Sequence, residues 1–387
     1  MIQAEDFVEV ARARGYTWYA GVPCSFLTPF INCVINDDRL RYVSSANEGD
    51  AVATAAGAAI GGKRACAMMQ NSGLGNAVSP LTSLTYVFRI PILVICTQRG
   101  APGVPDEPQH ELMGQITGAM LDTMHLPWET FPQEASAIAP TFDRAQEYMR
   151  REQRPYGLIM QKGTVAAHPL KKTPGRREGL GELRRHGLDV PAARPPRHEA
   201  LARIIELTPE STSVVIATTG YTGRELYALK DRVNQLYMVG SMGCASSLGL
   251  GLALARPDLT VVIVDGDGAA LMRMGNLAVI GAYGGNNLYH IVLDNEAYES
   301  TGAQRTITAG VEFAPVAHAC GYGLAIAGDR LGVIDELFTD PAARGPRLAH
   351  VKIRTGTLGS LPRPEVKPPE ALRRLMAHIG TNFPGER

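Results

Sequence analysis

The chain has 387 residues, of which 45% are hydrophobic and 20% charged, and its 38 basic side chains match its 38 acidic ones in number. This length suits two globular domains, and the zero net charge gives no electrostatic reason to expect nucleic acid or an anionic membrane surface as a partner. The apolar runs are strand-sized and too short to span a bilayer, and the acidic N-terminus lacks the basic and apolar segments of a signal peptide.

The first half of the chain alternates segments of helical and strand-like character. Helical spacing covers residues 3–13, and an alanine-rich helix is expected over residues 49–60. Strands are expected over residues 16–21, 64–70, 90–97 and 156–162. The run at 90–97 is almost continuously apolar, which is typical of strands buried on both faces of a parallel sheet.

The second half repeats this alternation. Strands are expected over residues 213–218, 235–239, 259–265 and 290–295. Alternating strands and helices favour an α/β protein with two doubly wound parallel sheets, one in each half. Residues 166–198 are rich in proline and carry eight Lys/Arg against three acidic residues. They lack an aromatic residue for stacking bases, so a solvated connection is favoured over a nucleic-acid arm.

The domain boundaries follow from this shift in composition. We predict a first domain at residues 1–168, a basic proline-rich linker at 169–198 and a second domain at 199–387.

The strongest chemical motif lies in the second half. Gly266-Asp267-Gly268 follows the apolar strand, and the next strand ends in Asp294-Asn295. Because the carboxyl ends of parallel strands meet at one edge of a sheet, both side chains can emerge there close together. Carboxylate and amide oxygens, completed by phosphate oxygens, are the ligands that Mg²⁺ prefers. The alternative is a simple turn with a helix-capping Asn, but the strand context and the spacing favour the metal site.

A turn at residues 239–243 and a glutamate in the first half add to this motif. The turn opens a helix of small residues, so its main-chain N–H groups suit anionic oxygens. Met242 in the turn could equally be a core residue. Glu48 stands at a strand-to-helix junction followed by alanines, where we expect its carboxylate to be desolvated. The alternative for Glu48 is a helix N-terminal residue that complements the dipole.

Together these residues resemble the thiamine-diphosphate-binding motif, in which a GDG precedes an Asn by one further strand. The resemblance implies that Asp267, Asn295 and the main-chain carbonyl of Ala297 hold Mg²⁺ against the cofactor's diphosphate. It also implies that Met242 bends the cofactor and that Glu48 activates it by sharing a proton with a ring nitrogen. Further cofactor contacts are implied for Gly240, Ser241, Gly266 and Gly268.

Other segments are similar to the phosphonopyruvate decarboxylases, a family of thiamine-diphosphate-dependent 2-oxo acid decarboxylases. These segments are GVPCSFL at 21–27, QNSGLGN at 70–76, RGAPG at 99–103, DEPQH at 106–110, TTGYTGRE at 218–225 and GAQ at 302–304. The resemblance implies two cofactor domains without a middle domain, and decarboxylation of 3-phosphonopyruvate to phosphonoacetaldehyde and CO₂. The resemblance also implies a role in phosphonate and antibiotic biosynthesis. The family usually has Asp at the position of Cys24 and Pro at that of Arg305.

Phosphonopyruvate carries two anionic groups that the protein must bind. Candidate donors to the phosphonate are Ser25, Asn71, Arg99, Gln109 and Arg305. His110 is the candidate for proton transfer or phosphonate binding, in a loop at residues 99–110 that would close over the substrate. A lone histidine is also often structural, and that alternative stays open.

The expected partners follow from the same resemblance. We expect a small 2-oxo acid as substrate, no nucleic acid or membrane partner, and a homodimer or higher homo-oligomer with sites at subunit interfaces. The six cysteines form no CxxC pair, so free thiols and a cytoplasmic location are expected. The alternative functions are a sulfopyruvate or other 2-oxo acid decarboxylase, and a non-catalytic cofactor-binding protein.

Overall fold

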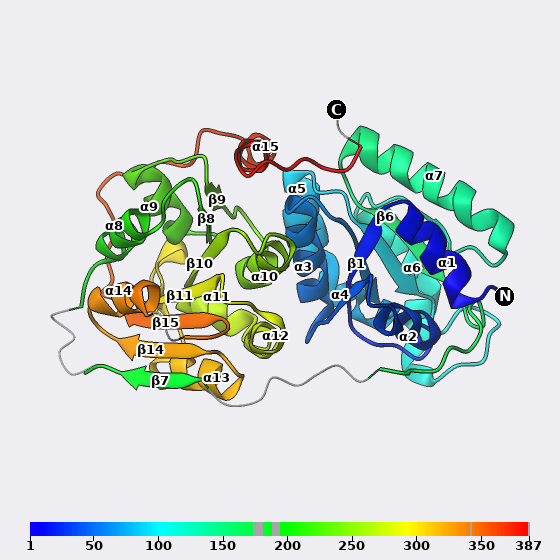
Figure 1. Ribbon diagram of the computed structural model, residues 1–387, viewed down its shortest axis with the longest axis horizontal. Helices are drawn as coiled ribbons and strands as arrows, with labels where there is room; N and C mark the ends of the chain where they lie inside the picture. The colour runs from blue at the N-terminus through cyan, green and yellow to red at the C-terminus, as the bar shows by residue number, and fades with distance from the viewer. Residues whose placement is uncertain (173–180, 188–193, 341–342, 386–387) are drawn as a thin grey trace. The chain divides into compact units, whose positions relative to one another are not determined.

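A computed structural model describes residues 1–172, 181–187, 194–340 and 343–385 (Figure 1). The chain divides into two compact units, Met1–Gly175 with Asn382–Arg387 and Arg176–Thr381. Each unit contains one large parallel sheet covered by helices. The predicted fold class, two α/β domains with parallel sheets and no middle domain, is therefore confirmed.

The sheet of the first unit has six strands in the order β2-β1-β3-β4-β6-β5. Its strands are β1 (Tyr16–Gly21), β2 (Arg41–Ser44), β3 (Arg64–Met69), β4 (Leu93–Thr97), β5 (Trp128–Thr130) and β6 (Tyr156–Met160). All of its strand pairs are parallel. Strand β4 is buried along its whole length, as its apolar run predicts.

Helices cover both faces of this sheet (Figure 1). They are α1 (Ala4–Ala13), α2 (Thr28–Asn36), α3 (Glu48–Ile60), α4 (Leu74–Pro80), α5 (Tyr86–Phe88), α6 (Glu111–Thr123) and α7 (Ala135–Glu152). Short 3₁₀ helices form at η1 (Asn71–Gly73) and η3 (Pro108–His110), and a π-helix forms at η2 (Leu81–Thr85). Helix α3 packs on β1 and β3 through its alanines and is buried from Gly49 to Ile60. On the other face α1, α2 and α7 enclose an aromatic cluster in which Phe7 stacks on Phe131 with ring centroids 4.4 Å apart.

The sheet of the second unit has seven strands in the order β7-β14-β15-β11-β10-β8-β9. They are β7 (Glu182–Arg185), β8 (Ser213–Ala217), β9 (Gln235–Tyr237), β10 (Thr260–Gly266), β11 (Leu288–Asp294), β14 (Leu324–Gly328) and β15 (Arg347–Lys352). Strands β10 and β11 run parallel as neighbours, with Gly266 opposite Leu293. This register brings the ends of both strands to the same level of the sheet.

The remaining elements of this unit are helices and one hairpin. The helices are α8 (Arg197–Leu207), α9 (Tyr221–Leu229), α10 (Ala245–Ala255), α11 (Asp267–Met272), α12 (Asn276–Tyr283), α13 (Phe313–Ala319), α14 (Gly332–Thr339) and α15 (Pro368–His378). The hairpin consists of β12 (Ala297–Tyr298) and β13 (Gln304–Arg305), with η5 (Glu299–Thr301) between them and η6 (Thr308–Gly310) after them.

The predicted linker at 169–198 differs from the structure. Strand β7 lies within it and forms the edge of the second sheet by pairing with β14. Arg184 on β7 forms ion pairs with Glu182, Glu336 and Asp340, so part of the basic character serves the sheet. Pro174 and Pro191 of the predicted linker lie outside the described residues. The final segment also differs, because Asn382–Arg387 belongs to the first unit.

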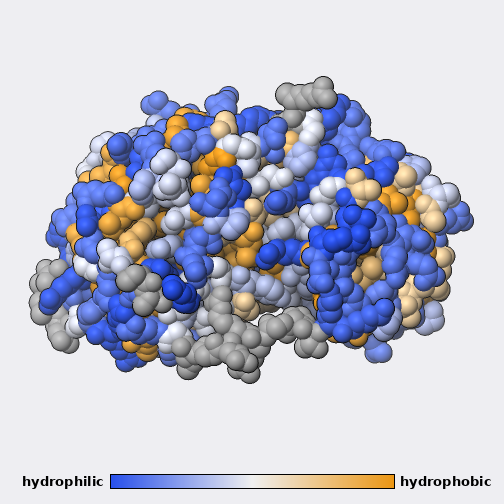
Figure 2. Space-filling view, in the orientation of Figure 1, coloured by the Kyte–Doolittle hydropathy of each residue, from blue (hydrophilic) through white to orange (hydrophobic). Residues whose placement is uncertain are grey.

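Two global expectations can be compared with the structure. The six cysteines are free, and five of them are buried, as expected for structural thiols. Within the described ranges, no helix combines the length and the apolarity needed to cross a bilayer. On the face shown in Figure 2, hydrophilic side chains predominate and apolar ones occur in small groups.

Candidate functional site

The carboxyl edge of the second sheet carries a hollow of about 60 Å³ between the ends of β8, β10 and β11. Asp267 is the first residue of α11, and Asn295 follows β11 directly. The hollow brings together six of the predicted cofactor residues, Met242, Gly266, Asp267, Gly268, Asn295 and Ala297. Gly240 and Ser241 do not line it.

Asp267 lies in the hollow as a buried carboxylate, with only 3% of its surface exposed. Its Oδ2 accepts hydrogen bonds from Thr306 Oγ1 (2.6 Å) and Thr308 Oγ1 (2.9 Å). Burial raises the pKa of Asp267, and the neighbouring charge of Asp294 adds to this effect. No Lys or Arg pairs with it within the described ranges, so a cation in the hollow would compensate a charge that is costly to bury.

Asn295 would offer a second oxygen ligand to such a cation, and hydrogen bonds with its neighbours orient its amide. Its Nδ2 donates to Glu299 Oε2 (2.7 Å), and its Oδ1 accepts from the Ala297 N–H (3.2 Å). Glu299 is itself paired with Arg197 at the start of α8. Carboxylate, amide and carbonyl oxygens in one hollow are a donor set that fits Mg²⁺. The sequence did not identify Glu299 and Arg197 as residues that support the site, because the two are separated by about a quarter of the chain.

Asp294, the residue before Asn295, is buried and does not line the hollow. His350 Nε2 (2.8 Å) and Lys352 Nζ (2.7 Å), both on β15, contact its Oδ2. Burial opposes its ionisation, but the hydrogen bonds from His350 and Lys352 hold the pKa of Asp294 below its usual value. Thr308 donates hydrogen bonds to both Asp294 and Asp267, so this network fixes the position of the Asp267 carboxylate.

Two turns beside the hollow depend on unusual backbone conformations. Ser241 and Gly243 have φ angles of 51° and 88°. Gly220, with φ 96°, precedes α9, whose first residues line the hollow. The N–H groups at the start of α9 suit anionic oxygens such as those of a diphosphate. The sequence segment TTGYTGRE covers this turn, although its role was not predicted.

Glu48 lies in the first unit, at the start of α3. Asn47 caps the helix, with its Oδ1 accepting from the Gly49 N–H (2.8 Å). The prediction of a desolvated Glu48 is wrong for the isolated chain, because its carboxylate is half-buried and accepts a hydrogen bond from Asn76 Nδ2 (2.8 Å). A Cβ on Gly73 would lie 2.1 Å from Glu48 Oε1, so a larger residue there would displace the Glu48 carboxylate. Both partners lie in the segment QNSGLGN, but their role was not predicted.

Two of the residues predicted to bind the phosphonate, Arg99 and Asn71, already form polar contacts within the protein. Arg99 forms an ion pair with Asp106, with Nε 2.7 Å from its carboxylate, and donates from Nη1 to Ser25 Oγ (2.9 Å). Asn71 is buried and donates to the Arg99 carbonyl (2.9 Å) and to Thr117 Oγ1 (3.0 Å). The hydrogen bonds from Arg99 lower the pKa of Asp106. Arg99 and Asn71 therefore fix the start of the loop at 99–110.

The other predicted donors and His110 differ in exposure. Gln109 is exposed in the first unit, and Arg305 is exposed on the hairpin of the second. His110 ends η3 and is buried, and its Nδ1 has no hydrogen-bond partner within the described ranges. A buried ring nitrogen without a partner is unusual in a purely structural histidine.

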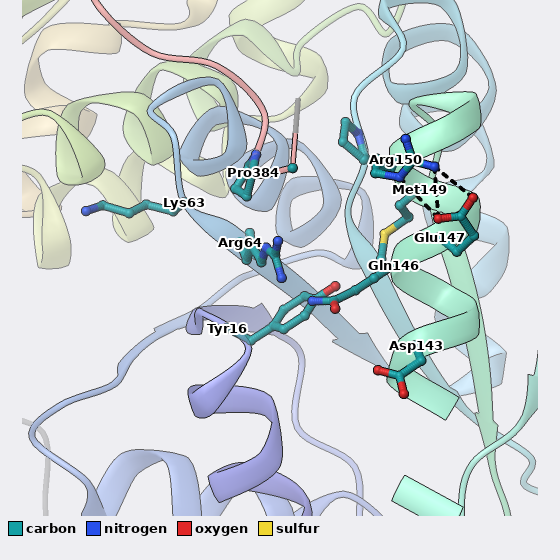
Figure 3. Close-up of a pocket in the computed structure, with 12 residues that line it drawn as sticks. Tyr16, Lys63, Arg64, Asp143, Gln146, Glu147, Met149, Arg150 and Pro384 are labelled. Carbon is teal, nitrogen blue, oxygen red and sulfur yellow. Dashed lines mark hydrogen bonds and ion pairs between the residues drawn. The ribbon is translucent and has the colours of Figure 1, made fainter. Parts of the chain in front are cut away.

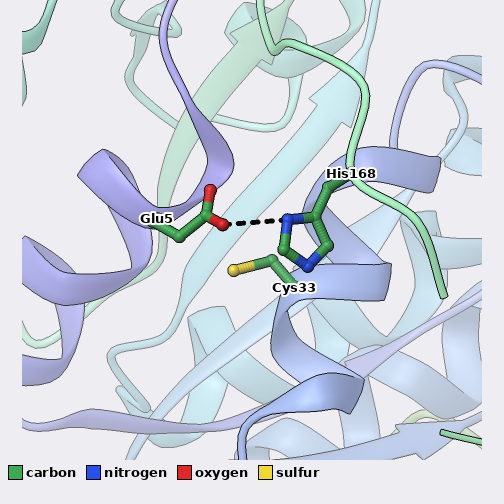
Figure 4. Close-up of side chains that lie close together, drawn as sticks. All are labelled: Glu5, Cys33 and His168. Carbon is green, nitrogen blue, oxygen red and sulfur yellow. Dashed lines mark ion pairs between the residues drawn. The ribbon is translucent and has the colours of Figure 1, made fainter. Parts of the chain in front are cut away.

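A cluster of Glu5, Cys33 and His168 has the residue types of a metal site (Figure 4). Its potential ligand atoms lie within 4.8 Å of one another, and Glu5 Oε1 is 3.0 Å from His168 Nδ1. However, Asn36 Oδ1 accepts from the Lys171 N–H, which leaves its Nδ2 to donate to His168 Nε2 (2.9 Å). Nδ1 must then carry the proton and donate it to Glu5. The cluster is thus a hydrogen-bonded clamp rather than a metal site.

A separate hollow of about 280 Å³ lies in the first unit between β3, α7 and the final segment (Figure 3). It is lined by Tyr16, Lys63 and Arg64, and also by Arg150, which bonds Glu147 (2.8 Å). None of the residues predicted for catalysis or cofactor binding lines it.

Comparisons with known proteins identify the family of the chain. Residues 1–124 match the family model of the thiamine pyrophosphate enzyme N-terminal TPP binding domain, and residues 219–337 match that of the C-terminal TPP binding domain. The chain is 46% identical to phosphonopyruvate decarboxylase of Streptomyces viridochromogenes over 98% of this chain and 96% of that protein. It is 29% identical to sulfopyruvate decarboxylase of Methanosarcina acetivorans, over 96% of each chain.

A solved structure shares the fold. It is a thiamine diphosphate-dependent 4-hydroxybenzoylformate decarboxylase of Rhodococcus jostii, with a TM-score of 0.69 and 15% identity, covering 93% of this chain and 100% of that one.

Proposed function

The chain belongs to the thiamine pyrophosphate enzymes, in the family of the phosphonopyruvate decarboxylases, and we propose from this that it decarboxylates 3-phosphonopyruvate to phosphonoacetaldehyde and CO₂. It is a carboxy-lyase that uses thiamine diphosphate and Mg²⁺. The observation that carries the proposal is the buried carboxylate of Asp267 beside Asn295, in a chain whose full length is similar to a phosphonopyruvate decarboxylase. The free thiols support a reducing compartment such as the cytoplasm.

Thiamine diphosphate supplies a nucleophilic ring carbon and an electron sink for the substrate carbon that loses CO₂. Asp267, Asn295 and the Ala297 carbonyl would hold Mg²⁺ against the diphosphate. Glu48, positioned by Asn76, would hold a proton at the cofactor's ring nitrogen. Met242, which lines the hollow, would support the bent cofactor.

The experiment that tests this function is a comparison of substrates on the holoenzyme. CO₂ release and the aldehyde product are measured with phosphonopyruvate, sulfopyruvate and pyruvate. The highest kcat/KM should be found with phosphonopyruvate. A higher kcat/KM with sulfopyruvate would identify sulfopyruvate as the substrate. No turnover of any 2-oxo acid despite bound cofactor would favour a non-catalytic role.

We expect His110→Ala to reduce turnover by about 100-fold while cofactor affinity stays within about threefold of wild type, because general acid–base groups contribute on that scale. Steady-state kinetics and a thiamine-diphosphate titration measure the two quantities. The unpartnered Nδ1 supports a role with substrate. Loss of cofactor binding and of thermal stability together would instead identify His110 as structural.

The active form is proposed to be at least a homodimer, with Glu48 of one subunit facing Asp267 of another. Exposed apolar side chains support this, because several of them flank the candidate site segments in both units. They are Val104 and Leu112, close to His110 in sequence, and three residues of the second unit: Val239, three residues before Met242, Met272, at the end of α11, and Ile307, between the Asp267 partners Thr306 and Thr308.

Mixing two inactive variants tests this arrangement. Glu48→Gln and Asp267→Ala subunits, mixed under exchanging conditions, should recover activity, since each mixed dimer then holds one intact site. Random pairing predicts about a quarter of the wild-type activity. Mass spectrometry of differently tagged subunits shows whether exchange occurred, and exchange without recovered activity would place both residues of a site in one chain.

A further inference from the structure

A second hollow in the second unit, of about 430 Å³, lies beside the cofactor hollow. Thr219, Gly220 and Ser300 line both of them. The walls of the second hollow come from the end of β9, the start of α9 and the segment that leads into α15. None of the residues predicted for the site reaches it, yet it borders the position where the cofactor would bind.

The charged side chains that line this hollow are all positive. Arg224 and Arg363 line it, and none of its described lining residues carries a carboxylate. The remaining walls are largely apolar, with Met238, Val239 and Val366 among them. A pocket with positive charge and little competing negative charge favours an anionic ligand. The cofactor hollow differs, since Asp267 and Glu299 line it.

The two arginines have different environments. Arg224 donates from Nη2 to the Leu361 carbonyl and from Nε to the Pro362 carbonyl (3.3 Å). It thereby ties the segment before α15 to α9 and positions Arg363. The guanidinium of Arg363 is exposed and forms no ion pair or hydrogen bond within the part of the chain that the structure describes. It is therefore available to a ligand.

We propose that this hollow binds the phosphonate group of the substrate and that Arg363 is the side chain that contacts the phosphonate oxygens. The inference rests on the proposed function. The substrate loses its carboxylate as CO₂ but keeps its phosphonate throughout the reaction. A cation that contacts the phosphonate can therefore hold substrate, intermediate and product alike. Of the two arginines predicted as phosphonate donors, Arg99 is already neutralised by Asp106, and Arg305 lies on the β12–β13 hairpin and does not line this hollow. A free guanidinium can bind two phosphonate oxygens at once, which an ammonium cannot do in the same geometry.

The test compares two substrates that differ at the phosphonate. In Arg363→Ala, kcat/KM for phosphonopyruvate should fall by about 10- to 100-fold, the scale of a lost hydrogen bond to a charged group. The value for pyruvate, which has no phosphonate, should change by less than about threefold. Arg363→Lys should be intermediate. Lys367→Ala is the matched control, because Lys367 is an exposed cation of the same segment that does not line the hollow.

A binding measurement separates this inference from the proposed function. Phosphonoacetate is titrated into wild-type and Arg363→Ala holoenzyme by calorimetry, and the wild type should bind it about tenfold or more tightly. Thermal melting and cofactor affinity confirm that the variant is folded. Equal phosphonoacetate affinity, or an unchanged kcat/KM for phosphonopyruvate, overturns the role of Arg363. If wild type releases CO₂ from another 2-oxo acid but not from phosphonopyruvate, the proposed function fails whatever the variant does.

Discussion

Replacing Asp267 by Ala should weaken Mg²⁺-dependent binding of thiamine diphosphate by at least about 100-fold, because the variant removes a metal ligand. Loss of a residue that only supports a ligand already lowers metal affinity by up to about 100-fold. Asn295→Ala should act in the same direction. The affinity is measured by titrating the cofactor at fixed Mg²⁺ and following intrinsic fluorescence.

The controls for Asp267 separate metal binding from folding. Asp258→Ala removes an exposed acid paired with Arg256, and cofactor affinity should not change. Asp267→Asn keeps the shape of the side chain and removes an uncompensated buried charge. Its melting temperature without cofactor should therefore equal or exceed that of wild type. Normal cofactor affinity in both Asp267 variants would refute the metal assignment.

Glu48→Gln should bind thiamine diphosphate with an affinity within about threefold of that of wild type, since other residues make the diphosphate contacts. Exchange of the proton on the reactive ring carbon of the bound cofactor should slow by about 100- to 10,000-fold, because the variant cannot share a proton with the ring nitrogen. The exchange is followed by NMR after acid quench. A wild-type exchange rate would remove Glu48 from the activation step.

Two neighbouring glycines give a second comparison for Glu48. A Cβ at Gly73 would collide with the Glu48 carboxylate, whereas a Cβ at Gly75 would meet nothing within 4 Å. Gly73→Ala should therefore slow the same exchange, and Gly75→Ala should leave it unchanged. Equal rates in the two variants would mean that the position of the carboxylate is unimportant.

The sequence predicts the parts of the fold that depend on local pattern. Strand β4 is marked by its apolar run, and the meeting of Asp267 with Asn295 follows from two strands whose ends carry polar residues. Both depend on short-range periodicity and on the common direction of parallel strands.

The features that the sequence did not predict depend on contacts that form only once the chain has folded. Strand β7 is short and charged, and it is a strand only because β14 offers it a free edge. Arg99 was assigned to the substrate, but Asp106 neutralises it once the loop folds back. The hollow beside Arg363 forms from three separate segments, and no local pattern marks it. Polar pairings of this kind become visible only in three dimensions.

The division of the chain has a topological consequence. The backbone begins in the first unit, runs through the second, and returns to the first at Asn382. The second unit is thus an insertion, joined to its host by two covalent crossings. Because the chain is linear, a single cut at the first crossing leaves the units joined only through the packing of the short final segment in the first unit, whereas a single cut at the second crossing leaves them covalently joined through the first. Each unit also stays at high effective concentration relative to the other, because both ends of the insert are tethered.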